Sequence, residues 1–271
     1  MQMEELAHLS AAEVRQAIRA GRWRRPTTGL ALGYVQANLV ILPADWAEEF
    51  AEFCRRNPQA LPLLEMTAPG DPEPRRLAPG ADLRTDLPRY RLYREGRLVE
   101  EREDLLPLWR SDLVAFLLGC SFSAERALLE AGVRLRHLEE GRNVAMYRTS
   151  RPCQATARLH GPLVVSMRPL RSSEVGRATE VTARYPLAHG APVHCGDPAA
   201  LGIADLARPD WGDPIDLAPE EVPVFWACGV TPQAVIAESR PPLAITHAPG
   251  YMFITDWRDQ DIDQRPGAGL F

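Results

Sequence analysis

Two histidines flank a short extended segment in "HGAPVHCGDP", which runs from His189 to Pro198. An imidazole exchanges protons near neutral pH, so His189 and His194 are candidates for a general base and a general acid. A structural role for each ring is the alternative. Asp197 stands where it would cap a following helix, and it is also a candidate for contacting a substrate. The histidine spacing is not that of a helical zinc motif, so we expect no metal.

A second corner lies in "EVPVFWACGVTPQAVI", where an apolar run ends at the thiol of Cys228 and a Thr-Pro pair opens a helix. At such a corner the backbone N–H groups of Gly229 and Val230 are free to bind an anion or a developing oxyanion. Cys228 is interpreted as a thiol that lines a pocket, with plain core packing as one alternative. Covalent catalysis through a thioester is another.

Three further side chains could bind a substrate. "VVSMRP" ends a strand with Ser166 and Arg168, and the planar guanidinium of Arg168 suits either a substrate carboxylate or a structural ion pair. His247 precedes a Pro-Gly turn that does not itself need a histidine. "GCSFS", residues 119–123, approaches the nucleophile-elbow pattern but lacks its last glycine and lies between two predicted helices, so we interpret it as structural.

The elements that must position these residues alternate between strands and helices, which predicts an α/β fold. Segment 120–186 has a strand–strand–helix order of its own, so we interpret it as an α+β subdomain inserted into a core domain of 1–119 plus 187–271. The Pro- and Gly-rich stretch 61–87 is predicted to be an excursion, and 260–271 a loose tail. The predicted helices are 9–23, 44–58, 104–119, 123–132 and 172–186; the strands are 33–43, 143–149 and 161–169; the hairpins are 90–101 and 243–256; the strand–turn–helix units are 191–202 and 222–239.

Composition narrows the classes of function. All 31 basic residues are arginine, so a lysine Schiff base and a Walker-type phosphate lysine are excluded. The net charge of −5 argues against a nucleic-acid partner. No apolar run approaches the roughly 20 residues that span a bilayer, and no secretory signal is evident, so we expect no membrane partner and a cytoplasmic location. The five widely spaced cysteines are expected to be reduced thiols.

Eight segments together resemble the D-glutamate cyclase family, and the resemblance extends from Thr27 to Asp256. "FWACGVTPQ" is its most specific part. The resemblance implies a three-layer α/β/α core with a smaller two-layer domain. It also implies dehydrating ring closure of D-glutamate to 5-oxo-D-proline without a cofactor. The segments are "QANLVILP", "DLRTDLPRY", "GCSFS", "VVSMRP", "HGAPVH", "GDP", "VPVFWACGVTPQ" and "THAPG".

Ring closure needs a base for the ammonium, donors for an oxyanion and an acid that expels water. His189 or His194 could act as base and acid, the amides of Gly229 and Val230 could bind the oxyanion, and Arg168 could hold the α-carboxylate. Two alternatives are open: a lyase or hydratase acting on another small carboxylate, and a non-catalytic module that binds such acids. In each case the partner is a small amino acid or carboxylate. The oligomeric state is also open, a homo-oligomer included.

Overall fold

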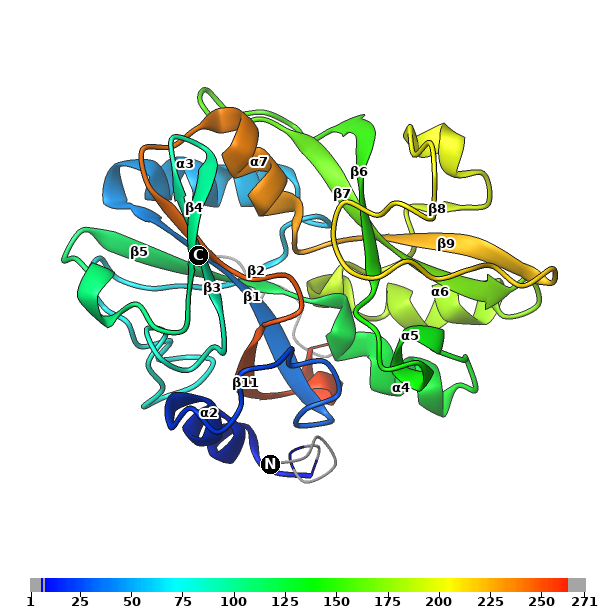
Figure 1. The fold of residues 1–271 in the computed structure, drawn as a ribbon, viewed down its shortest axis with the longest axis horizontal. Helices are drawn as coiled ribbons and strands as arrows, with labels where there is room; N and C mark the ends of the chain where they lie inside the picture. The colour runs from blue at the N-terminus through cyan, green and yellow to red at the C-terminus, as the bar shows by residue number, and fades with distance from the viewer. Residues whose placement is uncertain (1–5, 7, 263–271) are drawn as a thin grey trace.

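The chain is a mixed α/β protein, and the computed structural model describes Leu6 and residues 8–262 of it (Figure 1). The strands are β1 (Tyr34–Pro43), β2 (Leu63–Met66), β3 (Tyr90–Arg94), β4 (Arg97–Arg102), β5 (Leu113–Gly119), β6 (Ala145–Pro152), β7 (Pro162–Arg171), β8 (His194–Cys195), β9 (Glu221–Ala227), β10 (Ala244–His247) and β11 (Phe253–Arg258). The helices are α2 (Ala11–Arg19), α3 (Ala44–Arg56), α4 (Glu125–Glu130), α5 (Arg136–Glu139), α6 (Val175–Ala183) and α7 (Thr231–Ser239), with 3₁₀ turns η1 (Leu106–Leu108), η2 (Ser121–Ala124), η3 (Pro186–Ala188), η4 (Pro198–Leu201) and η5 (Asp259–Asp261).

The strands form two sheets. The large sheet has the order β2-β5-β1-β10-β3-β4, with β11 also paired to β1, and the small sheet has the order β6-β7-β9-β8. Every ladder among the described strands is antiparallel. The alternation of helices and strands along the sequence therefore does not produce a parallel sheet here.

The prediction of a helix over 104–119 is wrong. Leu113–Gly119 is strand β5, which is buried along its whole length and pairs residue by residue with β1. Its other edge pairs with β2, which lies inside the predicted excursion. A short continuous apolar run fits a buried helix and a buried strand equally well by periodicity, and here the pairing with β1 and β2 decides.

The predicted hairpin over 243–256 is also wrong in its pairing, although both strands exist. β10 and β11 do not pair with each other, since both lie antiparallel along the same edge of β1. Val40 and Ile41 pair with β10, whereas Gln36 and Ala37 pair with β11. The loop 248–252 separates the two strands, and it leaves a gap beside the middle of the central strand.

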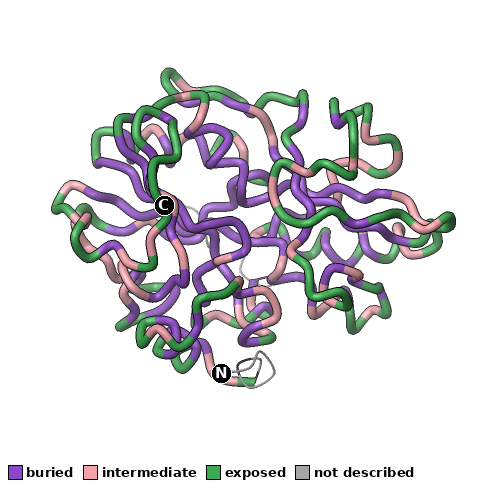
Figure 2. Tube along the Cα trace, in the orientation of Figure 1, coloured by how far each residue is buried: buried purple, intermediate pink, exposed green. Residues whose placement is uncertain are grey.

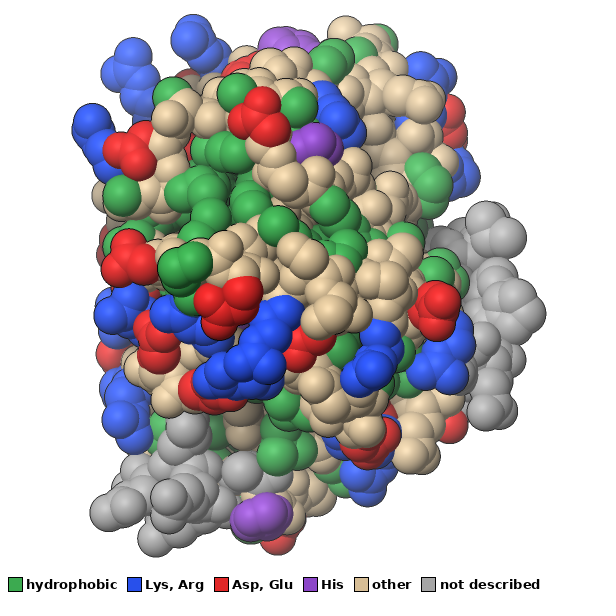
Figure 3. All heavy atoms as spheres, turned by 90° about the vertical axis from the view of Figure 1, so that its right-hand side faces the viewer, with side chains coloured by type: hydrophobic (Ala, Val, Ile, Leu, Met, Phe, Trp, Pro, Cys, Tyr) green, Lys and Arg blue, Asp and Glu red, His purple; other side chains and the backbone are tan. Residues whose placement is uncertain are grey.

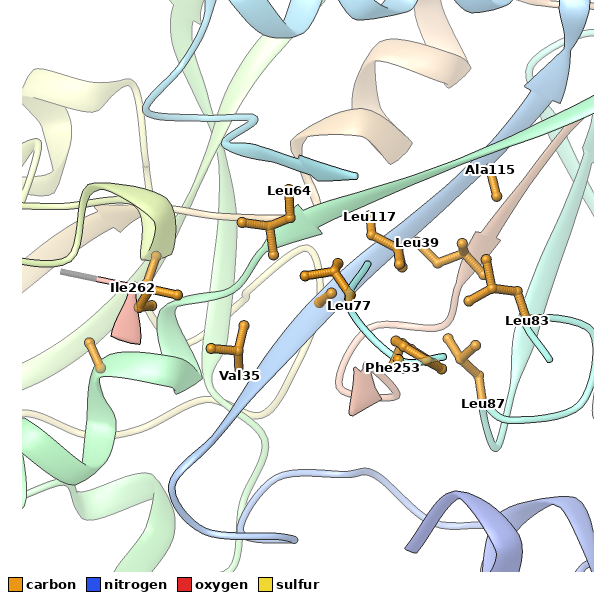
Figure 4. Packing of buried hydrophobic residues seen from close by; sticks show 14 of the residues in the cluster. Val35, Leu39, Leu64, Leu77, Leu83, Leu87, Ala115, Leu117, Phe253 and Ile262 are labelled. Atoms are coloured by element: carbon orange, nitrogen blue, oxygen red, sulfur yellow. The ribbon is translucent and has the colours of Figure 1, made fainter. Parts of the chain in front are cut away.

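The two faces of the large sheet are covered differently. Helices α3 and α7 pack on one face, and the part of the excursion that follows β2, residues 67–87, contributes leucines to the other. Figure 4 shows Leu39 of β1 and Leu117 of β5 close to Leu77 of the excursion. The same core cluster continues through α4 and α6 to Trp226 of the small sheet. In Figure 2, buried segments of the backbone continue from one half of the molecule to the other. The two halves share this core cluster.

The small sheet does not stop at the expected subdomain boundary. Its strands β6 and β7 lie within 120–186, but β8 and β9 come from the range assigned to the core domain. The predicted helices at 9–23, 44–58 and 172–186 are confirmed by α2, α3 and α6. Of the predicted tail, Gln260 to Ile262 includes part of η5, and 263–271 lies outside the described residues.

The outer surface mixes charges of both signs. Figure 3 shows arginine and acidic side chains side by side on the face over the small sheet, with apolar side chains between them. Short ion pairs such as Arg136 with Glu140 and Glu221 account for part of this mixing. Among the described residues, no helix is long and apolar enough to cross a membrane.

Gly119→Ala is expected to destabilise the protein, because a Cβ atom there would lie 1.6 Å from the backbone oxygen of Leu187. Overpacking of this kind costs about 1–3 kcal/mol, and a backbone atom cannot turn away as a side chain can. Gly176→Ala in α6 is the matched control, because its Cβ would meet no atom within 4 Å. Urea unfolding should show a loss for the first variant and a neutral or small stabilising effect for the second. Equal free energies of unfolding would contradict the packing argument.

Candidate active site in a cleft between the sheets

A narrow cleft of about 20 Å³, roughly the room that one water molecule needs, lies between the two sheets, at the gap beside β1. This volume is far below the range of about 300–1,000 Å³ for small-molecule sites, so a substrate of the size of glutamate would enter only after side chains of the lining move apart. Of the described residues that line the cleft, none is acidic and none is an arginine. The large sheet and its loops contribute Asn38, Cys120, Ser121, Phe122, His247, Gly250 and Met252, and the other wall consists of Asn143, Val144, Met146, Cys228, Gly229 and Val230.

Two strand-to-helix turns, one from each sheet, place a thiol in the cleft. Cys120 follows β5 and precedes η2, while Cys228 follows β9 and precedes α7. Burial raises the pKa of the Cys120 thiol to about 12 and that of Cys228 to about 11. Both thiols are therefore protonated at neutral pH, and neither has the depressed pKa of an activated nucleophile.

Gly229 allows the two sheets to meet at the cleft. A Cβ atom at this position would lie 1.9 Å from Nδ2 of Asn38, so no larger residue fits without displacing that amide. The same Nδ2 donates to the backbone oxygen of Gly119 at 2.7 Å. The start of α7 is held by Thr231, whose hydroxyl donates to the Cys228 oxygen at 2.7 Å. The turn between β9 and α7 is thus held by Asn38 on one side and by Thr231 on the other.

His247 fills the gap between β10 and β11. Its Nδ1 atom lies 3.2 Å from the backbone nitrogen of Leu39 and 3.3 Å from the backbone oxygen of the same residue. We assign Nδ1 as the acceptor of the Leu39 N–H, the shorter contact, so the imidazole takes the place of a missing strand partner. Its Nε2 atom is buried and has no partner among the described residues. Burial, aided by the charge of Arg91, lowers the pKa of His247 to about 4. At neutral pH the ring is uncharged, and with Nδ1 accepting, Nε2–H is a donor available to a ligand in the cleft.

Asn143 provides a second unpartnered atom on the opposite wall. Its Oδ1 atom is buried and has no hydrogen-bond partner in the described part of the chain, while its Nδ2 donates to the Pro249 oxygen at 3.3 Å. A free amide oxygen is an acceptor. The cleft therefore offers at least one neutral donor, at His247, and one neutral acceptor, at Asn143.

Arg168 lies behind the cleft wall. Its side chain is buried, and Nη2 donates to Glu125 at 2.7 Å and to Ser121 at 3.2 Å, while Nη1 donates to Ser166 at 3.2 Å. Burial by itself would raise the pKa of Glu125, but His137 and Arg168 outweigh it and hold the pKa below its usual value. Direct binding of a substrate carboxylate by Arg168, as hypothesised from the sequence, would require this network to open.

The other corner predicted from the sequence does not line the cleft. His189 is fully buried, its Nδ1 lies 2.8 Å from the Gln59 oxygen, and burial lowers its pKa to about 4. His194 lies in β8 with Nε2 2.8 Å from the backbone oxygen of Asp197, and the Asp197 side chain caps η4. The structure brings together Cys228, Gly229, Val230 and His247, and it does not bring His189, His194 or Asp197 to them.

Sequence reasoning missed Asn38, Ser121 and Asn143 as cleft residues. "GCSFS" carried a usable signal for Ser121, because a serine in a strand-to-helix turn is a common arrangement in active sites. The motif lacks the last glycine of the nucleophile elbow, and the helix predicted over 104–119 places it between two helices, so the sequence favours a structural role. With β5 as a strand, the motif stands at the turn where the cleft begins.

The described structure combines a mixed α/β fold with a narrow cleft between two sheets, and the described residues that line the cleft include no acidic residue and no arginine. The family profile described as D-glutamate cyclase matches residues 114–256. A protein of Rubrobacter xylanophilus is 63% identical over 253 residues, which covers 93% of this chain and 98% of that protein. One from Stutzerimonas stutzeri is 58% identical and covers 97% and 99%. Both carry the name "putative hydro-lyase".

The chain belongs to the D-glutamate cyclase family. Among solved structures, a nitrogen repressor-like protein from Methanococcus jannaschii aligns over 87% of this chain and 91% of its own, with 11% identity and a TM-score of 0.38. A score this low supports no inference about fold or function.

The stability of the protein is expected to fall as the pH drops from about 6.5 to about 4. His189 and His247 titrate near 4 when folded and near 6.5 when unfolded, so the unfolded state binds more protons in this window. Each histidine contributes a slope of at most about 1.4 kcal/mol per pH unit, and its contribution is fully present above pH 6.5. His247→Asn keeps an acceptor for Leu39 and should remove the share of one histidine. The free energy of unfolding is measured with urea at several pH values for the wild type and for His247→Asn. The same pH dependence in both proteins would mean that His247 is not buried in its neutral form.

Proposed function

We propose that this chain catalyses the dehydrating cyclisation of D-glutamate to 5-oxo-D-proline in the cleft between the sheets. Family membership and the names of the relatives support a hydro-lyase in general terms. The observation that favours this particular reaction is the lining of the cleft, which combines polar groups with the absence of charged side chains among its described residues.

An uncharged cleft favours the proton arrangement that ring closure needs. The amine must be neutral to attack, and the γ-carboxyl group is a better acceptor when it is protonated. One proton passed from the ammonium to the γ-carboxylate produces both forms. Water disfavours this transfer, because it solvates both charges. A desolvating cleft disfavours the charged forms and so shifts the equilibrium toward the neutral pair.

The overall reaction is then balanced within the substrate. The amine nitrogen bonds to the γ-carbon, the C–OH bond breaks, and the two protons lost from nitrogen leave with the oxygen as water. The amine and the carboxyl group are already tethered, so holding the folded conformer supplies much of the acceleration. No cofactor enters this scheme.

The cleft residues suit distinct roles in it. The amides of Gly229 and Val230 at the start of α7, together with Nε2–H of His247, are assigned as donors for the oxyanion that forms on the γ-carbon. The Val230 N–H also contacts the Cys228 thiol, a weak acceptor that an oxyanion would displace. The free Oδ1 of Asn143 is an acceptor for the substrate amine. A histidine with a pKa of about 4 is a poor base at neutral pH, so we assign His247 a donor role. The roles of base and acid hypothesised for His189 and His194 would require those rings to reach the cleft.

The direct test is mass spectrometry for loss of one water from D-glutamate incubated with the protein, with L-glutamate as the matched control. A panel of other amino and hydroxy acids covers the rival lyase. Turnover of another acid but not of D-glutamate would favour that rival, and saturable binding without turnover would favour a binding module.

A parallel assay with a strong chelator is expected to leave activity intact, since the described residues include no group of three or more His, Cys, Asp or Glu side chains that could hold a metal ion.

His247→Asn is expected to lower kcat about a hundredfold or more, the usual scale for a lost oxyanion donor. The asparagine keeps an acceptor for the Leu39 N–H, so folding at neutral pH should persist. Cys228→Ala is the matched comparison and should retain most activity, because the pKa of that thiol is raised to about 11. An inactive Cys228→Ala variant, with a glutamyl thioester trapped on the wild type, would instead identify the thiol as the nucleophile.

A further inference from the structure

We propose that the Ser121 hydroxyl binds the α-carboxylate of the substrate and that Arg168 is a positioning residue that fixes this hydroxyl as a donor. The assignment of the α-carboxylate rests on the proposed function. The contact between Arg168 and Ser121 does not rest on the proposed function, and this contact can be tested separately.

Ser121 is the first residue of η2, directly after Cys120, and it lines the cleft. Nη2 of Arg168 donates to its Oγ atom at 3.2 Å. A guanidinium has no acceptor, so this contact occupies a lone pair of Ser121 and leaves the hydroxyl proton pointing elsewhere. No acceptor for that proton is found in the part of the chain that the structure describes. A ligand in the cleft can supply one.

The guanidinium of Arg168 is itself held from several sides. Besides Ser121 it contacts Glu125 and Ser166, and it lies over the ring of Trp226 at 5.5 Å from the centroid. Glu125 is held in turn by His137, whose Nε2 lies 2.8 Å from the same Oε1 atom. The charged groups of Arg168 and Glu125 are buried and paired, so breaking the pair would leave a buried charge alone. The network therefore keeps the guanidinium, and with it the Ser121 hydroxyl, in one arrangement.

This arrangement supplies what the cleft otherwise lacks. Among its described lining residues there is no cation for the α-carboxylate, which stays charged throughout the reaction. A hydroxyl that accepts from a guanidinium is polarised into a stronger donor, so Ser121 extends the positive charge of Arg168 by one hydrogen bond. A permanent cation suits this permanent anion, while the amides of Gly229 and Val230 suit the oxyanion that develops only during the reaction.

The first experiment compares Ser121→Ala with Ser123→Ala from the same turn, which lies outside the cleft lining. Both are assayed on whichever acid of the panel the wild type converts. Ser121→Ala should raise KM about tenfold or more with kcat changed by less than a few-fold, because the contact is made equally in the ground and transition states. Ser121→Thr, which keeps the hydroxyl, should recover part of the loss. Equal KM values for the two alanine variants would overturn the proposal.

The second experiment needs no substrate. Ser121→Cys is made in a Cys195→Ser background, so that the remaining native thiols are buried and protonated at neutral pH. Burial raises the pKa of the neighbouring thiols, whereas a guanidinium within hydrogen-bond distance lowers the pKa of a thiol. The thiol of Ser121→Cys should therefore titrate at a lower pH than the same thiol in the control below, as measured by the ultraviolet absorbance of the thiolate. The control adds Glu125→Gln and Arg168→Met, which removes both charges of the pair and leaves neither buried alone.

In the control the introduced thiol should titrate at a higher pH, because burial is then no longer opposed by the guanidinium. The same pKa with and without Arg168 would show that the guanidinium does not act on position 121, whatever the substrate is. A wild-type protein that leaves D-glutamate unchanged while the thiol shift is present would overturn the proposed function and leave the Arg168–Ser121 contact standing. The two failures are therefore distinguishable.

Discussion

The structure depends on how the central strand β1 satisfies its backbone. It is ten residues long and almost entirely buried, with β5 along one edge and β10 and β11 in succession along the other. Where β10 ends and β11 has not begun, the N–H of Leu39 needs an acceptor, since leaving it unpaired costs about 1–3 kcal/mol. His247 supplies the acceptor. The residue that closes the sheet is also the one that lines the cleft.

That double role constrains the chemistry. A histidine buried to serve a backbone N–H is neutral, so its Nε2–H can donate, and the ring takes up a second proton, at Nδ1, only at acidic pH. The thiols at the two turns are protonated for the same reason. Burial thus favours neutral groups in the cleft, and Arg168, which lies behind the wall, acts in our proposal through Ser121 rather than by entering the site. Reactions that shift a proton within the substrate fit such a site better than reactions that need a charged base.

The sequence predicted the parts of the site that depend on local signals. The apolar run that ends at Cys228 and the proline that opens α7 are adjacent in the chain, so the strand-to-helix turn could be inferred directly. Ser121 was missed because its place depends on β5 being a strand, which is decided by pairing with residues far away in the sequence. His189 was selected by residue type, yet its environment is set by the Gln59 carbonyl. No local pattern contains that contact.

The division into two sheets does not make the cleft a hinge. One core cluster includes Leu39 and Leu117 of the large sheet together with Val224 and Trp226 of the small sheet, so the walls share their packing. Gly229 and Asn38 touch across the cleft so closely that a single methyl group would separate them. The cleft holds only about 20 Å³ in this conformation, so binding of a glutamate-sized substrate requires side chains of the lining to move. The shared core keeps the two walls in place during that movement, and the last part of the ordering of the site is completed during binding.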